Sequence, residues 1–162
     1  MSIKRNHLIS RRQFIKGSGV LLATSSLAAA GAGCSAIVYT PQQEVLEPPT
    51  YSLEEGGRVV VQLGRVPALN EAGGAAAIVD KTLENNLIIA RTAEDRFTVA
   101  ANYCSHRQMA LGYDHAKQRF YCSSLGGSEY DLDGKVLAGA AKEPLKLYQA
   151  ELQGRNLVIS LS

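Results

Sequence analysis

Residues 104–131 read CSHRQMALGYDHAKQRFYCSSLGGSEYD and contain two of the three cysteines of the chain. Cys104 and His106 form a Cys-x-His motif, and 15 residues separate His106 from Cys122. Thiolates combined with an imidazole are typical ligands of an iron–sulfur centre or of a metal of intermediate softness. This stretch therefore contains the candidate cofactor or metal site of the chain.

The residues that follow Cys122 extend this pattern. Residues 122–131 read CSSLGGSEYD, and a turn glycine (Gly134) and the loop 139–141 (GAA) come after them. This order resembles the Rieske family, whose motif is C-x-H, a spacer, C-x-x-H-G-S-x-[FY]-D, a turn glycine and a Gly-Pro-Ala loop. The resemblance runs from about residue 59 to residue 161.

The resemblance implies a 2Fe–2S cluster as the cofactor. Cys104 and Cys122 match the two thiolates that bind one iron, and His106 matches one of the two imidazoles that bind the other. Ser128 and Tyr130 match the residues that donate hydrogen bonds toward the sulfurs and raise the reduction potential.

The chain departs from the family pattern at several positions. The second histidine is missing, because its place is taken by Leu125 in one alignment and by Gly126 in the other. Neither side chain can bind iron. Met109 and Ser124 stand where some Rieske domains have two further cysteines that bridge the cluster loops, and Ala140 replaces the proline of the third loop.

Three interpretations of the site follow from this incomplete ligand set. In the first, a cluster is bound and His115, a water or a side chain of a partner fills the fourth position; we expect His115 to be a solvated histidine in the turn 112–114, away from the cluster. In the second, no cluster binds, and Cys104 and Cys122 come close enough to form a disulfide outside the cytoplasm. In the third, Cys104, His106 and Cys122 bind a single metal such as zinc, with water as fourth ligand.

Short apolar runs separated by turn residues predict the fold. Strands are expected over 58–63, 75–79, 87–91 and 96–101, and a hairpin over 145–152 and 156–161 around Gly154. No window outside residues 1–33 has a helical apolar face. The spacing indicates an all-β protein, a small antiparallel sandwich or barrel. With the resemblance, we expect a Rieske-type domain over 56–162, with cluster-binding loops over about 102–142.

The N-terminal segment 1–33 has the pattern of an export signal. It contains five cations and no acidic residue, and its Arg11-Arg12 pair is followed by Phe, Ile and Lys and then by small, weakly apolar residues. This segment resembles a twin-arginine signal. Residues 34–55, with three prolines, predict a flexible tether.

Cys34 is the candidate lipidation site. Residues 31–34 (GAGC) resemble a lipoprotein cleavage box, although Gly31 stands where leucine is usual. Ordinary cleavage at a small-residue site, or retention of the segment as an anchor, are the alternatives. We favour lipidation, which predicts a membrane-attached protein in the periplasm or on the outer side of the cytoplasmic membrane.

Charge and composition narrow the function further. Beyond residue 33, 12 Lys and Arg face 15 Asp and Glu, so the chain has no basic surface for nucleic acid. The resemblance implies a Rieske-type electron-transfer protein or oxidoreductase subunit rather than a self-sufficient enzyme. Its expected partner is a redox protein or a quinol-oxidising complex. The alternative is a degenerate Rieske-fold domain without a cluster that serves as a binding or structural module.

Overall fold

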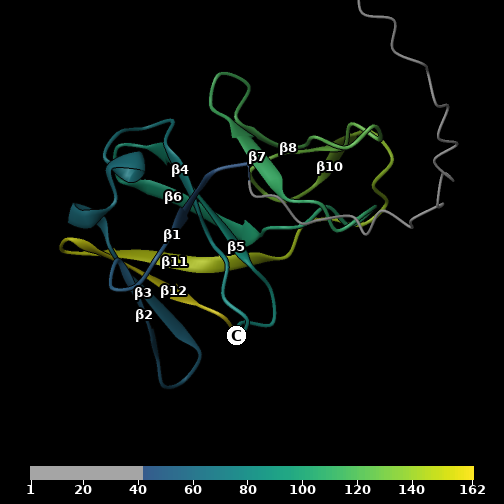
Figure 1. Cartoon of the computed structure of the whole chain (residues 1–162). Helices are drawn as coiled ribbons and strands as arrows, with labels where there is room; N and C mark the ends of the chain where they lie inside the picture. Colours follow the sequence, from purple (N-terminus) through teal and green to yellow (C-terminus); the bar gives the residue numbers. More distant parts are fainter. Residues whose placement is uncertain (1–41) are drawn as a thin grey trace, which may run out of the picture. The chain divides into compact units, whose positions relative to one another are not determined.

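The computed structural model describes residues 42–162, and these residues form two β-sheets (Figure 1). The larger sheet consists, in spatial order, of β1 (Glu44–Leu46), β4 (Ala75–Ile78), β5 (Leu87–Ala93), β6 (Arg96–Ala101), β11 (Leu147–Gln153), β12 (Asn156–Ser160), β3 (Arg58–Gln62) and β2 (Tyr51–Glu54). All neighbouring strands are antiparallel except β1 and β4, which are parallel. The expected signal segment 1–33 and Cys34 lie outside the described residues.

The smaller sheet is inserted between β6 and β11. It consists of β10 (Val136–Ala138), β9 (Glu129–Tyr130), β8 (Arg119–Cys122) and β7 (Leu111–Asp114), and all its pairs are antiparallel. In Figure 1, β7, β8 and β10 are grouped together, apart from the strands β2, β3 and β12 of the larger sheet. Two short 3₁₀ turns, Leu63–Arg65 and Pro67–Leu69, follow β3. Within residues 42–162, no helix is long and apolar enough to cross a membrane.

The larger sheet encloses a core to which every one of its strands contributes. Successive side chains of a strand point to opposite faces, so alternate residues reach this core. Val59 and Val61 of β3, for example, are fully buried, whereas Val60 between them is partly exposed. The fully buried members of this core include Val59, Val61, Leu69, Ala76, Ile78, Leu87, Ile89, Leu157 and Ile159.

Strands β5 and β6 are buried on both faces, and this positions the smaller sheet. Leu87 and Ile89 of β5 pack into the core of the larger sheet, whereas Ile88 on the opposite face packs into a second core. That second core contains Leu111 of β7 and Phe120 of β8, all fully buried. Burial of each such large side chain stabilises the fold by about 1.5–3 kcal/mol. The smaller sheet is therefore fixed against the outer face of β5 and β6.

The expected fold class is confirmed, since the described residues form an all-β, mainly antiparallel structure. The strands expected at 58–63, 75–79, 87–91, 96–101 and 156–161, and the hairpin around Gly154, occur with shifts of a few residues at their ends. The expected tether over 34–55 is wrong for its C-terminal part, because β1 and β2 fall within it. Leu46 and Tyr51 are buried in the core. The stabilisation from this burial outweighs the tendency of the prolines between these strands to form a turn.

The contact between Tyr51 and Asp80 makes stability depend on pH. Burial of the phenol, its hydrogen bond to Asp80 (Oη–Oδ2 3.0 Å) and nearby carboxylates raise the pKa of Tyr51 to about 12. A tyrosine in an unfolded chain has a pKa of about 10, so the folded state keeps a proton that the unfolded state loses above that pH. This contribution to stability is complete below about pH 10 and is lost as the pH rises toward about 12.

We predict that Tyr51→Phe lowers the free energy of unfolding by about 1 kcal/mol near neutral pH, the usual net worth of one hydrogen bond. Between about pH 10 and 12 the unmodified protein loses more stability than the variant, so the two values converge. Urea unfolding at a series of pH values measures this difference, with Tyr121→Phe as a control outside the contact. A difference that stays constant over this pH range would contradict the assignment.

Candidate functional site

Three loops at one end of the smaller sheet bring the candidate ligands together. The first loop, residues 102–110, leads into β7; the second, residues 123–128, connects β8 to β9; the third, residues 139–146, connects β10 to β11. In the first loop, Cys104 N–H donates to Met109 O (2.8 Å) and Gln108 N–H donates to Cys104 O (2.7 Å). The side-chain oxygen of buried Asn102 accepts from Leu111 N–H (2.8 Å), which joins the start of the loop to β7.

The second and third loops are held to each other by main-chain contacts. Cys122 N–H donates to Ser128 O (2.8 Å), which closes the second loop at its base. Ala140 N–H donates to Gly126 O (3.0 Å), and Ala141 N–H donates to Ser128 Oγ (3.0 Å).

Gly139 allows this close approach of the second and third loops. Its φ is +87°, and a Cβ at this position would lie 2.5 Å from Gly127 O and from Ser128 Cα. Only glycine fits such a position.

The Cys104 sulfur lies in a buried environment of hydrogen-bond donors. Tyr130 Oη lies 3.4 Å from Cys104 Sγ, and both residues are fully buried. Ser105 Oγ lies 3.3 Å from Tyr130 Oη and donates to Glu143 O (3.0 Å) in the third loop. Because the Ser105 hydroxyl donates its proton to the main-chain oxygen of Glu143, it can only accept a hydrogen bond from Tyr130. The Tyr130 proton is therefore shared between the Ser105 oxygen and the Cys104 sulfur.

The two thiols differ in their tendency to ionise. Burial raises the pKa of Cys104, but hydrogen bonds from Tyr130, the main-chain N–H of His106, Ser128 and Cys122 outweigh it, so the pKa of this thiol is below its ordinary value. Burial raises the pKa of the Cys122 thiol, and the neighbouring Cys104 raises it further, although Ser124 lowers it. Burial and the contact with Cys104 raise the pKa of Tyr130 to about 12, so its phenol keeps its proton near neutral pH.

Ser124 contacts the Cys122 thiol, a role that the sequence did not indicate. The Cys122 thiol lies 3.1 Å from Ser124 Oγ. The spacing of two residues in Cys-Ser-Ser, which permits a local side-chain hydrogen bond, is the signal that could have suggested it. Cys104 and Cys122 are both free thiols.

The histidines occupy very different places. His106 is exposed, and its ring lies against Gly126. His115 is at the opposite end of the β7–β8 hairpin from Cys122, because Leu111 pairs with Cys122 and Asp114 with Arg119. The expectation that His115 lies in a turn away from the site is confirmed, but residues 112–114 belong to β7 and the turn begins at His115.

The structure does not gather the candidate ligands around a single ion. Among the described residues, no three His, Cys, Asp or Glu side chains come close enough together to hold one metal. The single-zinc interpretation, which requires Cys104, His106 and Cys122 to converge on one point, stays a prediction.

A comparison with known protein families identifies this arrangement. The model of the Rieske [2Fe–2S] domain matches residues 60–149, which is more than half of the chain. The chain belongs to the Rieske [2Fe–2S] domain family. The matched range includes the three loops, β7 to β10, and the strands β4, β5 and β6 of the larger sheet.

Individual relatives agree with this assignment. The chain is 28% identical to cytochrome b6-f complex iron-sulfur subunit 2 of Nostoc sp. (strain PCC 7120), in an alignment that covers 96% of this chain and 86% of the relative. It is 22% identical to the cytochrome b6-f complex iron-sulfur subunit of Chlorobaculum tepidum, over 93% of this chain and 73% of the relative.

A solved structure shares the fold. The ferredoxin of carbazole 1,9a-dioxygenase from Nocardioides aromaticivorans superimposes with a TM-score of 0.52 at 17% identity, over 64% of this chain and 95% of the ferredoxin.

The residues of this Rieske domain fit a 2Fe–2S cluster at three of its four ligand positions. The buried thiol pair has hydrogen-bond donors directed at the Cys104 sulfur, which favours the thiolate form needed for binding iron. His106 supplies an imidazole at the exposed edge. Neither Leu125 nor Gly126 has a side chain that can bind iron, so the chain matches three of the four ligand positions of the family pattern.

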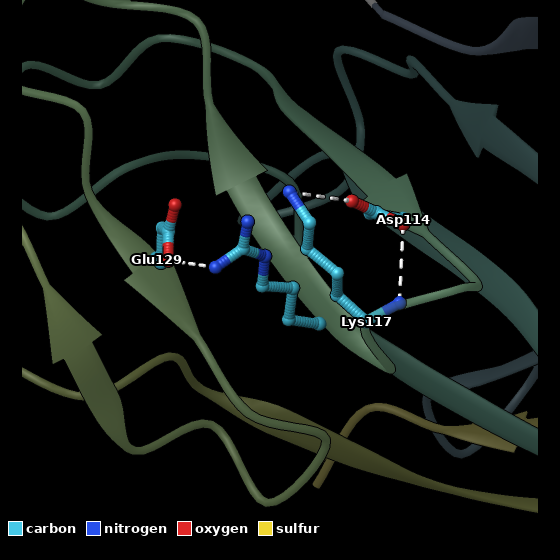
Figure 2. A network of polar contacts seen from close by, with 4 residues as sticks. Asp114, Lys117 and Glu129 are labelled. Carbon is cyan, nitrogen blue, oxygen red and sulfur yellow. Dashed lines mark hydrogen bonds and ion pairs between the residues drawn. The ribbon is translucent and has the colours of Figure 1, made fainter.

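Charged side chains of β7, β8, β9 and the turn between β7 and β8 border the site. A hollow of about 240 Å³ beside Cys122 and Ser128 is lined by Asp114, Lys117, Arg119 and Glu129, among others. Arg119 forms an ion pair with Glu129, and Lys117 Nζ lies 3.6 Å from Asp114 Oδ2 (Figure 2).

The Arg119–Glu129 pair helps to orient Tyr130. Because side chains alternate along β9, Glu129 on the outer face leaves Tyr130 pointing inward, toward Cys104. The ion pair therefore holds β9 to β8 in the register that the Tyr130–Cys104 contact requires.

Proposed function

We propose that this Rieske domain is a one-electron carrier with a 2Fe–2S cluster held by Cys104, Cys122 and His106. The observation that carries this proposal is the buried contact between Tyr130 Oη and Cys104 Sγ, because a protonated phenol aimed at a cysteine sulfur has no role in apolar packing. The family membership supports the same cofactor. When bound, such a cluster supplies reversible one-electron redox chemistry.

Each residue of the site has a distinct role in this proposal. Cys104 and Cys122 bind as thiolates, and His106 binds as a neutral imidazole. Tyr130 donates a hydrogen bond to the Cys104 sulfur. Ser128 accepts from Ala141 N–H, so its own proton is available for the sulfur side of the site. These donors stabilise negative charge on sulfur and therefore favour the reduced state.

The family and the N-terminal segment support a proposal for the partner and the location of this chain. The relatives are named as iron–sulfur subunits of cytochrome b6-f complexes, which supports a membrane redox complex as the partner of this chain. Because the edge formed by His106, Leu125 and Gly126 is accessible from solvent, we expect electrons to be exchanged with the partner there. Export by the twin-arginine route and a lipid at Cys34 would hold the domain at the outer side of the cytoplasmic membrane.

Cofactor content tests the function directly. We predict that protein expressed with sufficient iron and sulfide and purified without air contains iron and acid-labile sulfide in equal amounts and gives an EPR signal after reduction. Cys104→Ser abolishes the iron content because it removes a thiolate ligand, whereas His115→Ala, at the far end of the β7–β8 hairpin, leaves it unchanged. Colourless, iron-free protein made under these conditions would favour the cluster-free binding module instead.

Tyr130→Phe tests the role of the phenol in setting the reduction potential. We predict that the variant keeps its iron but has a lower potential, because the reduced state loses a hydrogen bond to sulfur. A difference of about 1 kcal/mol between the two redox states corresponds to about 40 mV for one electron. Redox titration followed by EPR measures the shift, with Tyr113→Phe as the matched control. An unchanged or higher potential would remove Tyr130 from the proposed role.

A further inference from the structure

The contacts of the second loop fix which of its residues faces the first loop. Cys122 begins the loop and Ser128 ends it, and their main-chain hydrogen bond sets the length between them. Five residues, 123–127, lie inside, whereas the family motif C-x-x-H-G-S has four. Because Ser128 and Tyr130 both contact the site as their motif positions require, the additional residue lies between Cys122 and the expected histidine position.

Leu125 and Gly126 are the central residues of a turn and point in different directions. Gly127 N–H donates to Ser124 O (2.9 Å), which closes a four-residue turn. The Leu125 side chain is fully exposed to solvent. A Cβ built on Gly126 would instead lie 2.9 Å from His106 Nδ1 and 3.1 Å from Ala140 Cβ. Residue 126 therefore faces the imidazole of the first loop, and residue 125 faces away from it.

The backbone at residue 126 can accept a side chain. Gly127 has a φ of +52°, in the region that favours glycine, but the φ of Gly126 is not in this region. The closest neighbour of the added Cβ is the ring of His106, the far end of a flexible side chain that is exposed at the surface. A Cβ at this position therefore requires a small movement of that ring and a shift of a few tenths of an ångström at Ala140, whose Cβ lies 3.1 Å away.

We propose that residue 126 is the fourth ligand position of the centre, that Gly126 leaves it open, and that a small neutral nitrogen donor of the imidazole class binds there from outside the chain. This inference rests on the proposed function for its cofactor. The donor would use its lone pair to form one bond to iron, without any transfer of electrons, on the face shared by His106 and Ala140. Imidazole nitrogen is chosen because it suits iron and already supplies the neighbouring ligand.

Three variants of the second loop test whether residue 126, rather than residue 125, is the ligand position. We predict that Gly126→His increases iron retention against a chelator by about tenfold or more, the scale on which partners of a metal ligand alter metal affinity. Leu125→His, in which the new imidazole points into solvent, leaves retention at the level of the unmodified protein. Gly126→Ala, which adds a Cβ without a ligand, also leaves it there. Equal gains from Leu125→His, or from Gly126→Ala, would overturn the assignment of residue 126.

The open position is tested by titrating the reduced, iron-loaded protein with imidazole. We expect a saturable change in the visible and EPR spectra of the unmodified protein and of Leu125→His, but none for Gly126→His, whose own side chain occupies the position. An iron-loaded protein that does not respond would show that the position is closed and would contradict the inference.

Failure of the proposed function gives a different result. If the unmodified protein contains no iron, the function is wrong for the native chain. The chelator comparison of the three variants still decides between residues 125 and 126 as the ligand position, because Gly126→His alone should then acquire iron. If none of the variants acquires iron, the inference is also wrong.

Discussion

The arrangement of the site depends on the burial of strands β5 and β6 on both of their faces. One face, with Leu87 and Ile89, completes the core of the larger sheet, and the other face, with Ile88, supports the smaller sheet through Leu111 and Phe120. Because both faces of β5 and β6 are buried away from water, the smaller sheet has one position in which its apolar residues are also buried. Cys104, in the loop that follows β6, and Cys122 at the end of β8 are brought together by this packing.

The fold was predictable from the sequence where one strand face is clearly apolar. Residues 58–62 and 156–160 alternate between buried and exposed side chains, and their strands were expected at the correct positions. Strands β1 and β2 were missed because prolines surround them, and only their long-range pairing with β4 and β3 makes them strands. Likewise, Gly112 and Asp114 resemble turn residues, but pairing with β8 makes them part of β7.

The candidate site was predictable in its chemistry but not in its geometry. Cysteine and histidine spacing identified Cys104, His106 and Cys122, and the structure brings the two thiols and their donors together. The sequence pattern fitted two alignments of the missing histidine, because a loop with one added residue can place it on either side. The direction of each side chain in a closed turn separates the two, and this depends on hydrogen bonds that residue types alone do not determine.

The site combines a protected interior with an incomplete exterior. The thiols are buried and are surrounded by hydrogen-bond donors from Tyr130 and Ser128. The imidazole edge is exposed, and a glycine stands at its second position. We therefore expect the sulfur-bound iron to be held firmly, and the other iron to be open to exchange with donors from solution or from a partner.

Electron–nuclear double resonance of the reduced protein, in a buffer free of imidazole and other nitrogen donors, tests this account most directly. It counts the nitrogen atoms bound to iron, and His106→Ala provides the control that removes the expected one. Our account predicts one strongly coupled histidine nitrogen in the unmodified protein and none in the variant. Two such nitrogens in the unmodified protein, or one that persists in His106→Ala, would contradict it.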